Sequence, residues 1–133
     1  MAANTAPIFP STPIVGIATL TSATAVTSRA NITGTTGLTQ LTATSTNGTR
    51  VDTITVKAKA TTVASNVFIW IYNGTTSYLF DEFDVTVVTA ANTTDSFILS
   101  RTYTTLVLPP TYQLFISETV QTDLNVIAFG GQY

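Results

Sequence analysis

Three carboxylates lie close together in the middle of the sequence, at Asp81, Glu82 and Asp84. Two convergent carboxylates can act as a general acid and base, and several oxygen ligands at close spacing can bind Ca²⁺. If this segment is a β-strand, Asp81 shares one face with Phe83. Phe80 and Glu82 then lie on the opposite face, so the adjacent acids diverge. We interpret them as solvated acids at a strand end; the alternatives are a catalytic pair and a weak Ca²⁺ site through Asp81 or Asp84.

Nucleophilic catalysis would need a base that activates one of the many serine and threonine hydroxyls. The chain contains no histidine and no cysteine, which removes the commonest base and any thiolate nucleophile or metal ligand. A serine–lysine pair would need Lys57 or Lys59, and both are expected on the solvent side of the alternating segment 51–59. We therefore predict that the protein is not an enzyme and has no catalytic residue, metal ligand or cofactor.

The composition predicts one domain that lies against other protein surfaces. A chain of 133 residues is long enough for one hydrophobic core. Only 9% of its residues are charged, whereas ordinary domains have about 25%. Its five basic residues are scattered and the net charge is −2, so we predict no nucleic-acid partner. The longest apolar runs have the length of a strand, so we predict no membrane association.

The periodicity of the sequence predicts an all-β fold with no helix longer than one turn. Nearly a quarter of the residues are threonine, whose β-branched side chain suits a pleated sheet. Turn residues such as Asn47-Gly48 and Asn73-Gly74 separate short apolar stretches, as in sandwiches and barrels. We predict a single β-sandwich of about eight or nine strands, with a jelly roll as one candidate arrangement. The predicted strands cover residues 14–20, 38–44, 51–59, 67–72, 78–88, 96–101, 112–118 and 124–129.

Prolines recur at three-residue spacing in the first part of the chain. This spacing prevents a helix and favours extended backbone. We therefore predict an extended N-terminal arm over residues 1–13, which carries Ile8 and Phe9, followed by a β-sandwich domain over residues 14–133.

Segment 67–72, Val-Phe-Ile-Trp-Ile-Tyr, is apolar on both faces. Such a strand is central in a sheet or lies under a partner subunit. We expect this segment and segment 124–129 to form buried core close to subunit contacts. The Phe-Gly-Gly sequence at the C-terminus suits a chain end that turns away from the last strand.

From residue 46 onward the chain resembles a group of short structural virion proteins encoded by tailed bacteriophages. An alternating strand is followed by an aliphatic hairpin closed at Tyr-Asn-Gly-Thr, a Leu-Pro turn, and a C-terminal Asn-Val-Ile-Ala-Phe-Gly-Gly. The segments that carry the resemblance are TNGTRVDTITVKA (46–58), VFIWIYNGTTSYLFDEFDVTVVT (67–89), LVLPPTYQLFIS (106–117) and LNVIAFGGQY (124–133).

The resemblance implies a capsid decoration or cement protein. Such a protein binds the outside of the phage head, bridges neighbouring subunits of the major capsid protein, and often forms a homotrimer. The expected location is then the capsid surface of the virion, after assembly in the host cytoplasm. The residues that we expect to contact the capsid or another subunit are Ile8, Phe9, Pro10, Trp70 and Tyr72.

The alternative function is a receptor-binding or carbohydrate-binding module associated with a phage tail or fibre. Aromatic side chains on one open face could stack against sugar rings. The candidates for such a platform are Trp70, Tyr72, Tyr78, Tyr103 and Tyr112.

Overall fold

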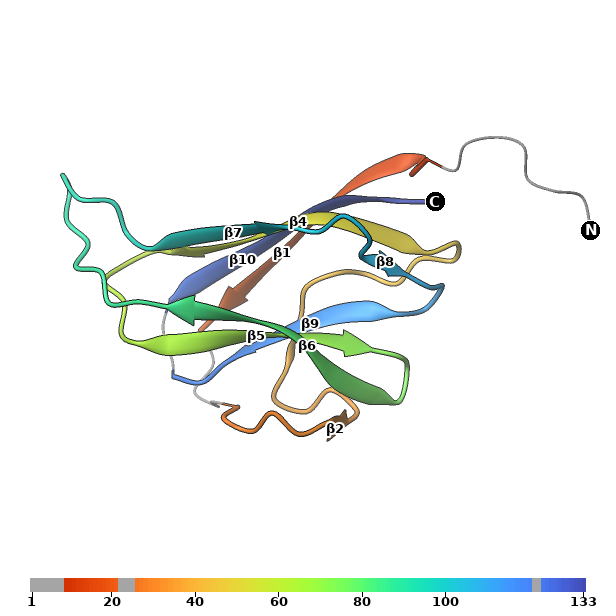
Figure 1. Ribbon diagram of the computed structural model, residues 1–133, viewed down its shortest axis with the longest axis horizontal. Helices are drawn as coiled ribbons and strands as arrows, with labels where there is room; N and C mark the ends of the chain where they lie inside the picture. Colours follow the sequence, from red (N-terminus) through yellow and green to blue (C-terminus); the bar gives the residue numbers. More distant parts are fainter. Residues whose placement is uncertain (1–8, 22–25, 121–122) are drawn as a thin grey trace, which may run out of the picture.

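The computed structural model describes residues 9–21, 26–120 and 123–133, which fold into two antiparallel β-sheets packed face to face (Figure 1). This confirms the predicted all-β sandwich. The described residues contain ten strands and no helix. The strands are β1 (Thr12–Leu20), β2 (Ile32–Thr33), β3 (Thr39–Gln40), β4 (Thr49–Ala58), β5 (Ser65–Tyr72), β6 (Thr76–Val85), β7 (Ile98–Thr102), β8 (Val107–Leu108), β9 (Gln113–Glu118) and β10 (Leu124–Gln132).

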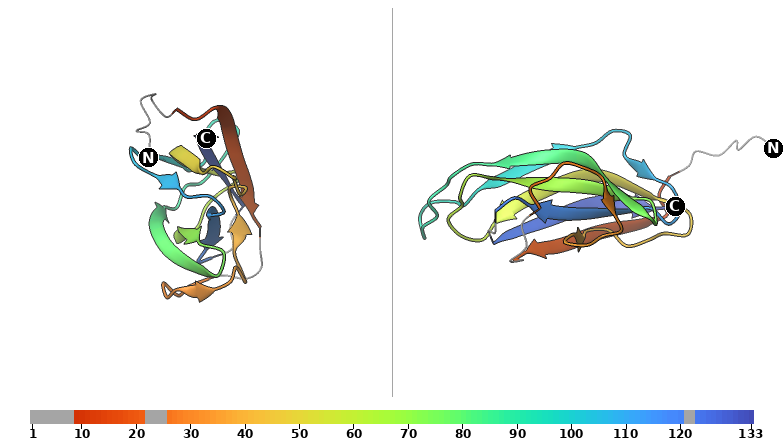
Figure 2. Two further views of the ribbon diagram at one scale, coloured as in Figure 1. Left: turned by 90° about the vertical axis from the view of Figure 1, so that its right-hand side faces the viewer. Right: turned by 90° about the horizontal axis from the view of Figure 1, so that it is seen from below.

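The strand order is that of a jelly roll. Sheet A has the order β1-β10-β4-β7, with β8 also pairing with β4, and sheet B has the order β2-β6-β5-β9-β3. Strands from the two halves of the chain pair as in one long folded hairpin: β1 with β10, β3 with β9, β4 with β7, and β5 with β6. These pairs alternate between the two sheets, which Figure 2 shows from two further directions.

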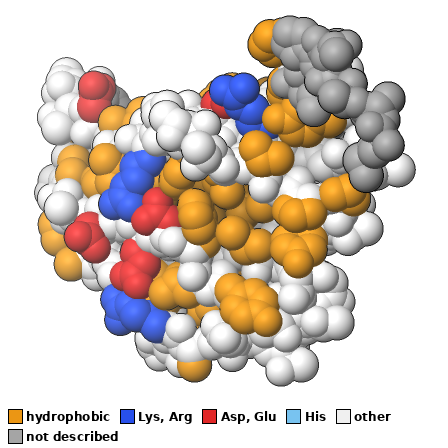
Figure 3. Space-filling model, turned by 45° about the vertical axis from the view of Figure 1, so that its right-hand side comes forward, with side chains coloured by type: hydrophobic (Ala, Val, Ile, Leu, Met, Phe, Trp, Pro, Cys, Tyr) orange, Lys and Arg blue, Asp and Glu red, His pale blue; other side chains and the backbone are white. Residues whose placement is uncertain are grey.

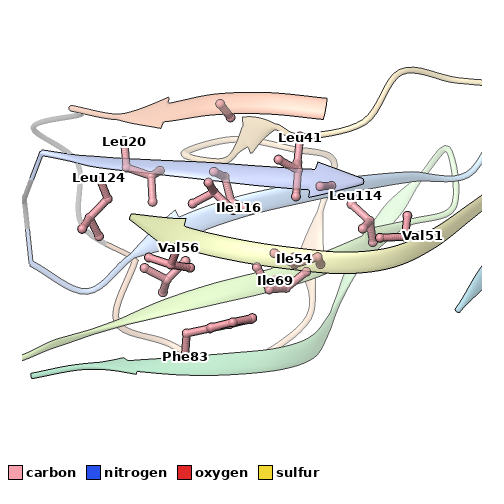
Figure 4. Close-up of a cluster of buried hydrophobic side chains, with 14 of the residues drawn as sticks. Leu20, Leu41, Val51, Ile54, Val56, Ile69, Phe83, Leu114, Ile116 and Leu124 are labelled. Atoms are coloured by element: carbon pink, nitrogen blue, oxygen red, sulfur yellow. The ribbon is translucent and has the colours of Figure 1, made fainter. Parts of the chain in front are cut away.

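The main hydrophobic core lies between the two sheets (Figure 4). β4 illustrates how the sequence produces it, because its apolar residues alternate with threonine and lysine. Ile54, Val56 and Ala58 are buried, as predicted. They meet Ile69 and Phe83 from sheet B. Burial of apolar surface at such positions is the dominant favourable contribution to folding.

Sheet B is also covered on its other face, and this explains the two-sided apolar strand. Phe68, Trp70 and Phe115 are buried there under residues of the segment that precedes β4, in a second cluster. Figure 1 shows this segment and β2 below β5 and β6. Segment 67–72 was predicted to be central in a sheet or to lie under a partner subunit. β5 is central in sheet B, and its second face is covered by another segment of the same chain.

The strand boundaries differ from the sequence prediction mainly at the ends of strands. β1 begins at Thr12, so Thr12 and Pro13 belong to the sandwich and not to an arm that reaches residue 13. The predicted strand 38–44 is reduced to two residues, and residues 86–88 lie outside β6. The short strands β2 and β8 were not predicted, because two residues give no periodic signal.

The prediction that the C-terminal glycines turn away from the sheet is wrong. β10 continues through both glycines and pairs with β1 and β4 up to Gln132. A Cβ atom at Gly130 would lie 1.9 Å from the carbonyl oxygen of Arg50. The glycine therefore permits close contact between two strands at a register shift, as glycine in a strand often does.

Candidate functional site

Asp81 and Glu82 lie in the middle of β6 and point to opposite faces of sheet B. Asp81 contacts residues of sheet A, whereas Glu82 contacts the segment on the outer face. This confirms that the adjacent acids diverge. The interpretation of both as solvated acids at a strand end is wrong, because each has a basic partner.

Asp81 joins the two sheets through a small polar cluster. Its carboxylate accepts hydrogen bonds from the guanidinium of Arg101 and, at 2.6 Å, from the hydroxyl of Tyr103. Arg101 lies on β7 and its guanidinium carbon is 4.6 Å from the ring centre of Phe83, a cation–π distance. Asp81 and Phe83 therefore share the inward face, as predicted.

The pKa of Asp81 reflects this environment. Burial acts to raise it, but the hydrogen bonds from Tyr103, Arg101 and the Glu82 amide together hold the pKa of the carboxyl below its ordinary value. Burial and the hydrogen bond to Asp81 raise the pKa of Tyr103. The phenol is thus a neutral donor and the carboxylate a charged acceptor across the whole physiological range.

Glu82 fixes the covering segment on the other face. Arg29 donates two hydrogen bonds to its carboxylate, at 2.6 and 2.9 Å, in a bidentate pair. The hydrogen bonds and charge of Arg29 lower the pKa of Glu82 against a small opposing effect of burial. Figure 3 shows acidic and basic side chains lying next to one another on one side of the molecule. Asp81 and Glu82 are thus held by structural partners on opposite faces of sheet B.

A β-bulge alters the direction of Phe80. Ile69 pairs with Asp81 and Trp70 pairs with Leu79, so Phe80 has no partner on β5. The extra residue places Phe80 on the same side as Asp81, where its ring centre is 5.6 Å from that of Tyr103. The predicted sharing of a face by Phe80 and Glu82 is therefore wrong. Bulges often redirect a side chain beside a functional site.

A shallow hollow of about 280 Å³ opens beside Phe80. Its other walls come from the end of β7 and from the β7–β8 connection, which together contribute one phenol ring, three threonines and one leucine. Phe80 is 40% exposed, so an aromatic surface is accessible at one side of the hollow. The lining residues are Phe80, Thr102, Tyr103, Thr104, Thr105 and Leu106. An apolar ring beside several hydroxyl groups suits a small ligand that is itself both apolar and hydroxylated.

The residues predicted to make capsid or subunit contacts do not form one site. Ile8 lies outside the described residues. Phe9 is exposed at the start of the described chain, whereas Pro10 packs close to Gly131 of β10.

The two aromatic residues of β5 lie within the protomer. Trp70 is fully buried and its Nε1 donates a hydrogen bond of 2.9 Å to the hydroxyl of Ser117. Its side chain therefore offers no exposed surface for a direct contact. Tyr72 is partly buried against Phe115, and its hydroxyl donates to the carbonyl oxygen of Gly74.

The outer face of sheet A carries a set of apolar side chains on adjacent strands, three of them exposed and one, Ile127, partly buried. Val15 is paired with Phe129 and Ile17 with Ile127, so the four side chains form a square across β1 and β10. Val15, Ile17 and Phe129 are 55%, 64% and 46% exposed. We call these residues the apolar quartet: Val15, Ile17, Ile127 and Phe129.

Hydroxyl groups continue the same face beyond the quartet. Thr53 of β4 pairs with Phe129, and Thr55 pairs with Ile127. Thr55 and Ser100 are in turn hydrogen-bonded through their hydroxyl oxygens at 2.7 Å. The face is therefore apolar on β1 and β10 and hydroxyl-rich on β4 and β7. Sequence periodicity identified the strands, but it gave no information on which strands are neighbours.

Comparison of the chain with protein-family models, curated proteins and solved structures found no match. Among the described residues, no helix has the length and hydropathy needed to cross a bilayer. No group of three or more acidic side chains within the described ranges is placed to bind a metal ion.

Proposed function

We propose that this chain is a non-enzymatic structural protein of a tailed-phage virion, which decorates the outside of the head. In this proposal the outer face of sheet A docks on neighbouring subunits of the major capsid protein and bridges them. The observation that carries the proposal is the apolar quartet, an uncovered apolar surface on a regular sheet. Contiguous exposed apolar side chains typically indicate a protein–protein contact.

Two further arguments support the proposal. Residues 46–133 resemble short virion proteins of tailed phages, and the jelly roll is a fold that viral capsid domains use. The fold is an analogy and does not by itself define a function. Asp81 and Glu82 could have indicated an enzyme, because their carboxylates are adjacent in the sequence. Both are held in ion pairs, on opposite faces of β6.

The energetics fit a protein that binds a repetitive shell. Val15, Ile17 and Phe129 are each roughly half exposed, so each contributes about 1 kcal/mol when it is covered. One such contact is weak by itself. Repetition over the identical subunits of a shell, with each copy in contact with more than one subunit, gives a much higher effective affinity.

The proposal is tested by cosedimentation of the purified protein with phage heads that lack it. Wild-type protein is expected to pellet with the heads, and Phe129→Lys to bind at least about tenfold more weakly, because a charge replaces an apolar contact at the centre of the interface. Val87→Lys is the matched control, since Val87 is also well exposed but lies in the connection after β6. Equal binding by both variants, or no binding by wild-type protein, contradicts the proposal.

The second candidate is a carbohydrate-binding module, and the hollow beside Phe80 is the observation that favours it. Of the five aromatic residues expected to form a platform, Trp70 is buried and Tyr112 packs against the main core, whereas Tyr103 lines the hollow. Phe80 and Tyr103 instead present a ring beside hydroxyl groups. Jelly rolls also occur in lectins.

Glycan-array binding distinguishes this candidate. If the hollow binds a sugar ring, Phe80→Ala is expected to abolish the signal, because stacking on an aromatic face is lost. Tyr78→Ala is the matched control, since Tyr78 lies on the same strand, is 43% exposed and does not line the hollow. The absence of any glycan signal from wild-type protein, or a loss only in Tyr78→Ala, excludes the hollow as a sugar site.

A further inference from the structure

Three of the four sheet edges in the described part of the chain have features that discourage pairing with another chain. β2 and β3, the outer strands of sheet B, are two residues long. β7, at one edge of sheet A, is five residues long and its Arg101 points inward to Asp81. Very short edge strands and inward-pointing charges are common protections against edge-to-edge association.

The fourth edge, β1, lacks these protections. β1 has nine residues, none of them charged, and forms one margin of sheet A (Figure 2). Within the described residues, the hydrogen bonds of its backbone run to β10 alone. Pro13 interrupts the donors only near its start, so the stretch Ile14–Leu20 is a continuous unpaired edge.

We propose that two copies of this chain associate through antiparallel pairing of their β1 strands around Gly16, which makes sheet A continuous across the pair. In this register Val15 lies opposite Ile17 of the second copy. Among the described residues, β1 pairs with β10 on one side only, and the pairing adds backbone hydrogen bonds on the other side. A two-fold contact of this kind closes on itself. The proposal does not depend on the docking of the protein to a viral shell.

A second copy fits this edge for two reasons. Gly16 lies at the centre of β1, so self-pairing around it aligns the whole strand with its copy. The strand contains no charge, so no like charges meet across the two-fold axis. The pairing also brings the two apolar quartets side by side on one face, because Val15 and Ile17 belong to both the edge and the quartet.

The mass of the full chain in solution gives the first test. Sedimentation equilibrium of wild-type protein, without shells, is expected to show reversible association from 14.1 kDa to twice that mass. A monomer at all concentrations overturns the proposal, and so does the homotrimer that the sequence resemblance implies. Neither outcome bears on cosedimentation with phage heads, which tests the proposed function separately.

Two double variants separate edge pairing from stacking of the apolar faces. Val15→Lys with Ile17→Lys places lysine opposite lysine, and the dimer dissociation constant is expected to rise by a factor on the order of 10 or more. Val15→Lys with Ile17→Glu places lysine opposite glutamate in the proposed register, so the dimer is expected to persist. Both variants remove the same apolar surface, so equal loss of the dimer in both overturns edge pairing.

Hydrogen–deuterium exchange provides a readout of the backbone itself. Amides of β1 are expected to exchange more slowly at high protein concentration than at low concentration, while those of β7 do not change. A dimer in which β1 shows no such protection uses another surface and contradicts the proposal. Circular dichroism of both double variants verifies the fold, which is expected to be retained because both side chains are more than half exposed.

Discussion

Asp81 and Glu82 are neighbours in the chain but stabilise different parts of the molecule. Asp81 connects β6 to Arg101 and Tyr103, which come from sheet A and from the turn that follows it. Glu82 connects β6 to Arg29 in the segment that covers the outer face. A strand with period two sends adjacent side chains to opposite faces, so one dipeptide can hold three layers together.

The Asp81 cluster predicts an acid-sensitive contribution to stability. Because the folded-state pKa of Asp81 is lowered, its contribution is fully present above the unfolded value of about 3.9 and is lost as the pH falls through the folded value. Asp81→Asn is expected to reduce the free energy of unfolding by about 1–2 kcal/mol at pH 7. The difference from wild type should shrink between pH 4 and pH 2.

Urea unfolding at pH 7, 5, 4, 3 and 2 measures this difference. Asp95→Asn is the control, since Asp95 is an exposed carboxylate in the connection between β6 and β7. If Asp81→Asn costs the same at every pH, the ionised carboxylate makes no net contribution through its partners.

The alternation of residues predicted the directions of Asp81, Glu82 and Phe83, but it did not predict that of Phe80. Simple alternation holds only while each residue has a partner on the neighbouring strand. The bulge at Phe80 breaks it, and the sequence contains no glycine or proline there to indicate the extra residue. The ion pairs were missed for a related reason, because Arg29 and Arg101 are distant in sequence and their register with β6 is a tertiary property.

At the scale of elements, β10 shows how a strand can require glycine without a turn. Gly130 lies against the backbone of Arg50 at the register shift between β10 and β4. The sequence prediction treated the two glycines as a chain end, because glycine is common where a strand stops. Close approach of two backbones requires the same residue, and only the packing distinguishes these cases.

Gly130→Ala is therefore expected to destabilise the fold by about 3 kcal/mol, because the added methyl group overlaps the backbone carbonyl of Arg50 on the neighbouring strand. Thermal unfolding followed by circular dichroism measures the effect. Gly34→Ala is the control: a Cβ there meets no atom within 4 Å, and its cost comes only from the positive φ angle of 77°. A smaller loss in Gly130→Ala than in Gly34→Ala contradicts the steric explanation.

The turn between β5 and β6 was predictable from the Asn73-Gly74 pair. Asn73 accepts hydrogen bonds at its Oδ1 from the amides of Thr75 and Thr76, and Gly74 has a φ angle of 99°. Both features are local chemistry of an Asn-Gly turn, which does not depend on the rest of the fold. Strand pairs that close over a long distance, such as β1 with β10, contain no such local signal.

At the scale of the whole molecule, the low content of charged residues can be related to a particular surface. The sequence indicated a protein that lies against other proteins, because few charges protect it from association. The structure places three of the exposed apolar side chains, Val15, Ile17 and Phe129, together on the outer face of sheet A. It also pairs two of the three acids of β6 with arginine. This surface exists because β1 and β10 are neighbours in sheet A. The sequence pattern predicts each strand, but it does not predict that two strands so distant in the chain lie side by side.

The position of β10 also has a consequence for the synthesis of the protein. β10 lies between β1 and β4, in the interior of sheet A, and Leu20 of β1 pairs with Leu124 of β10. β1 can therefore pair within its sheet only after the ribosome has translated the chain as far as β10. A stop codon before β10 leaves β1 and β4 without the strand that joins them.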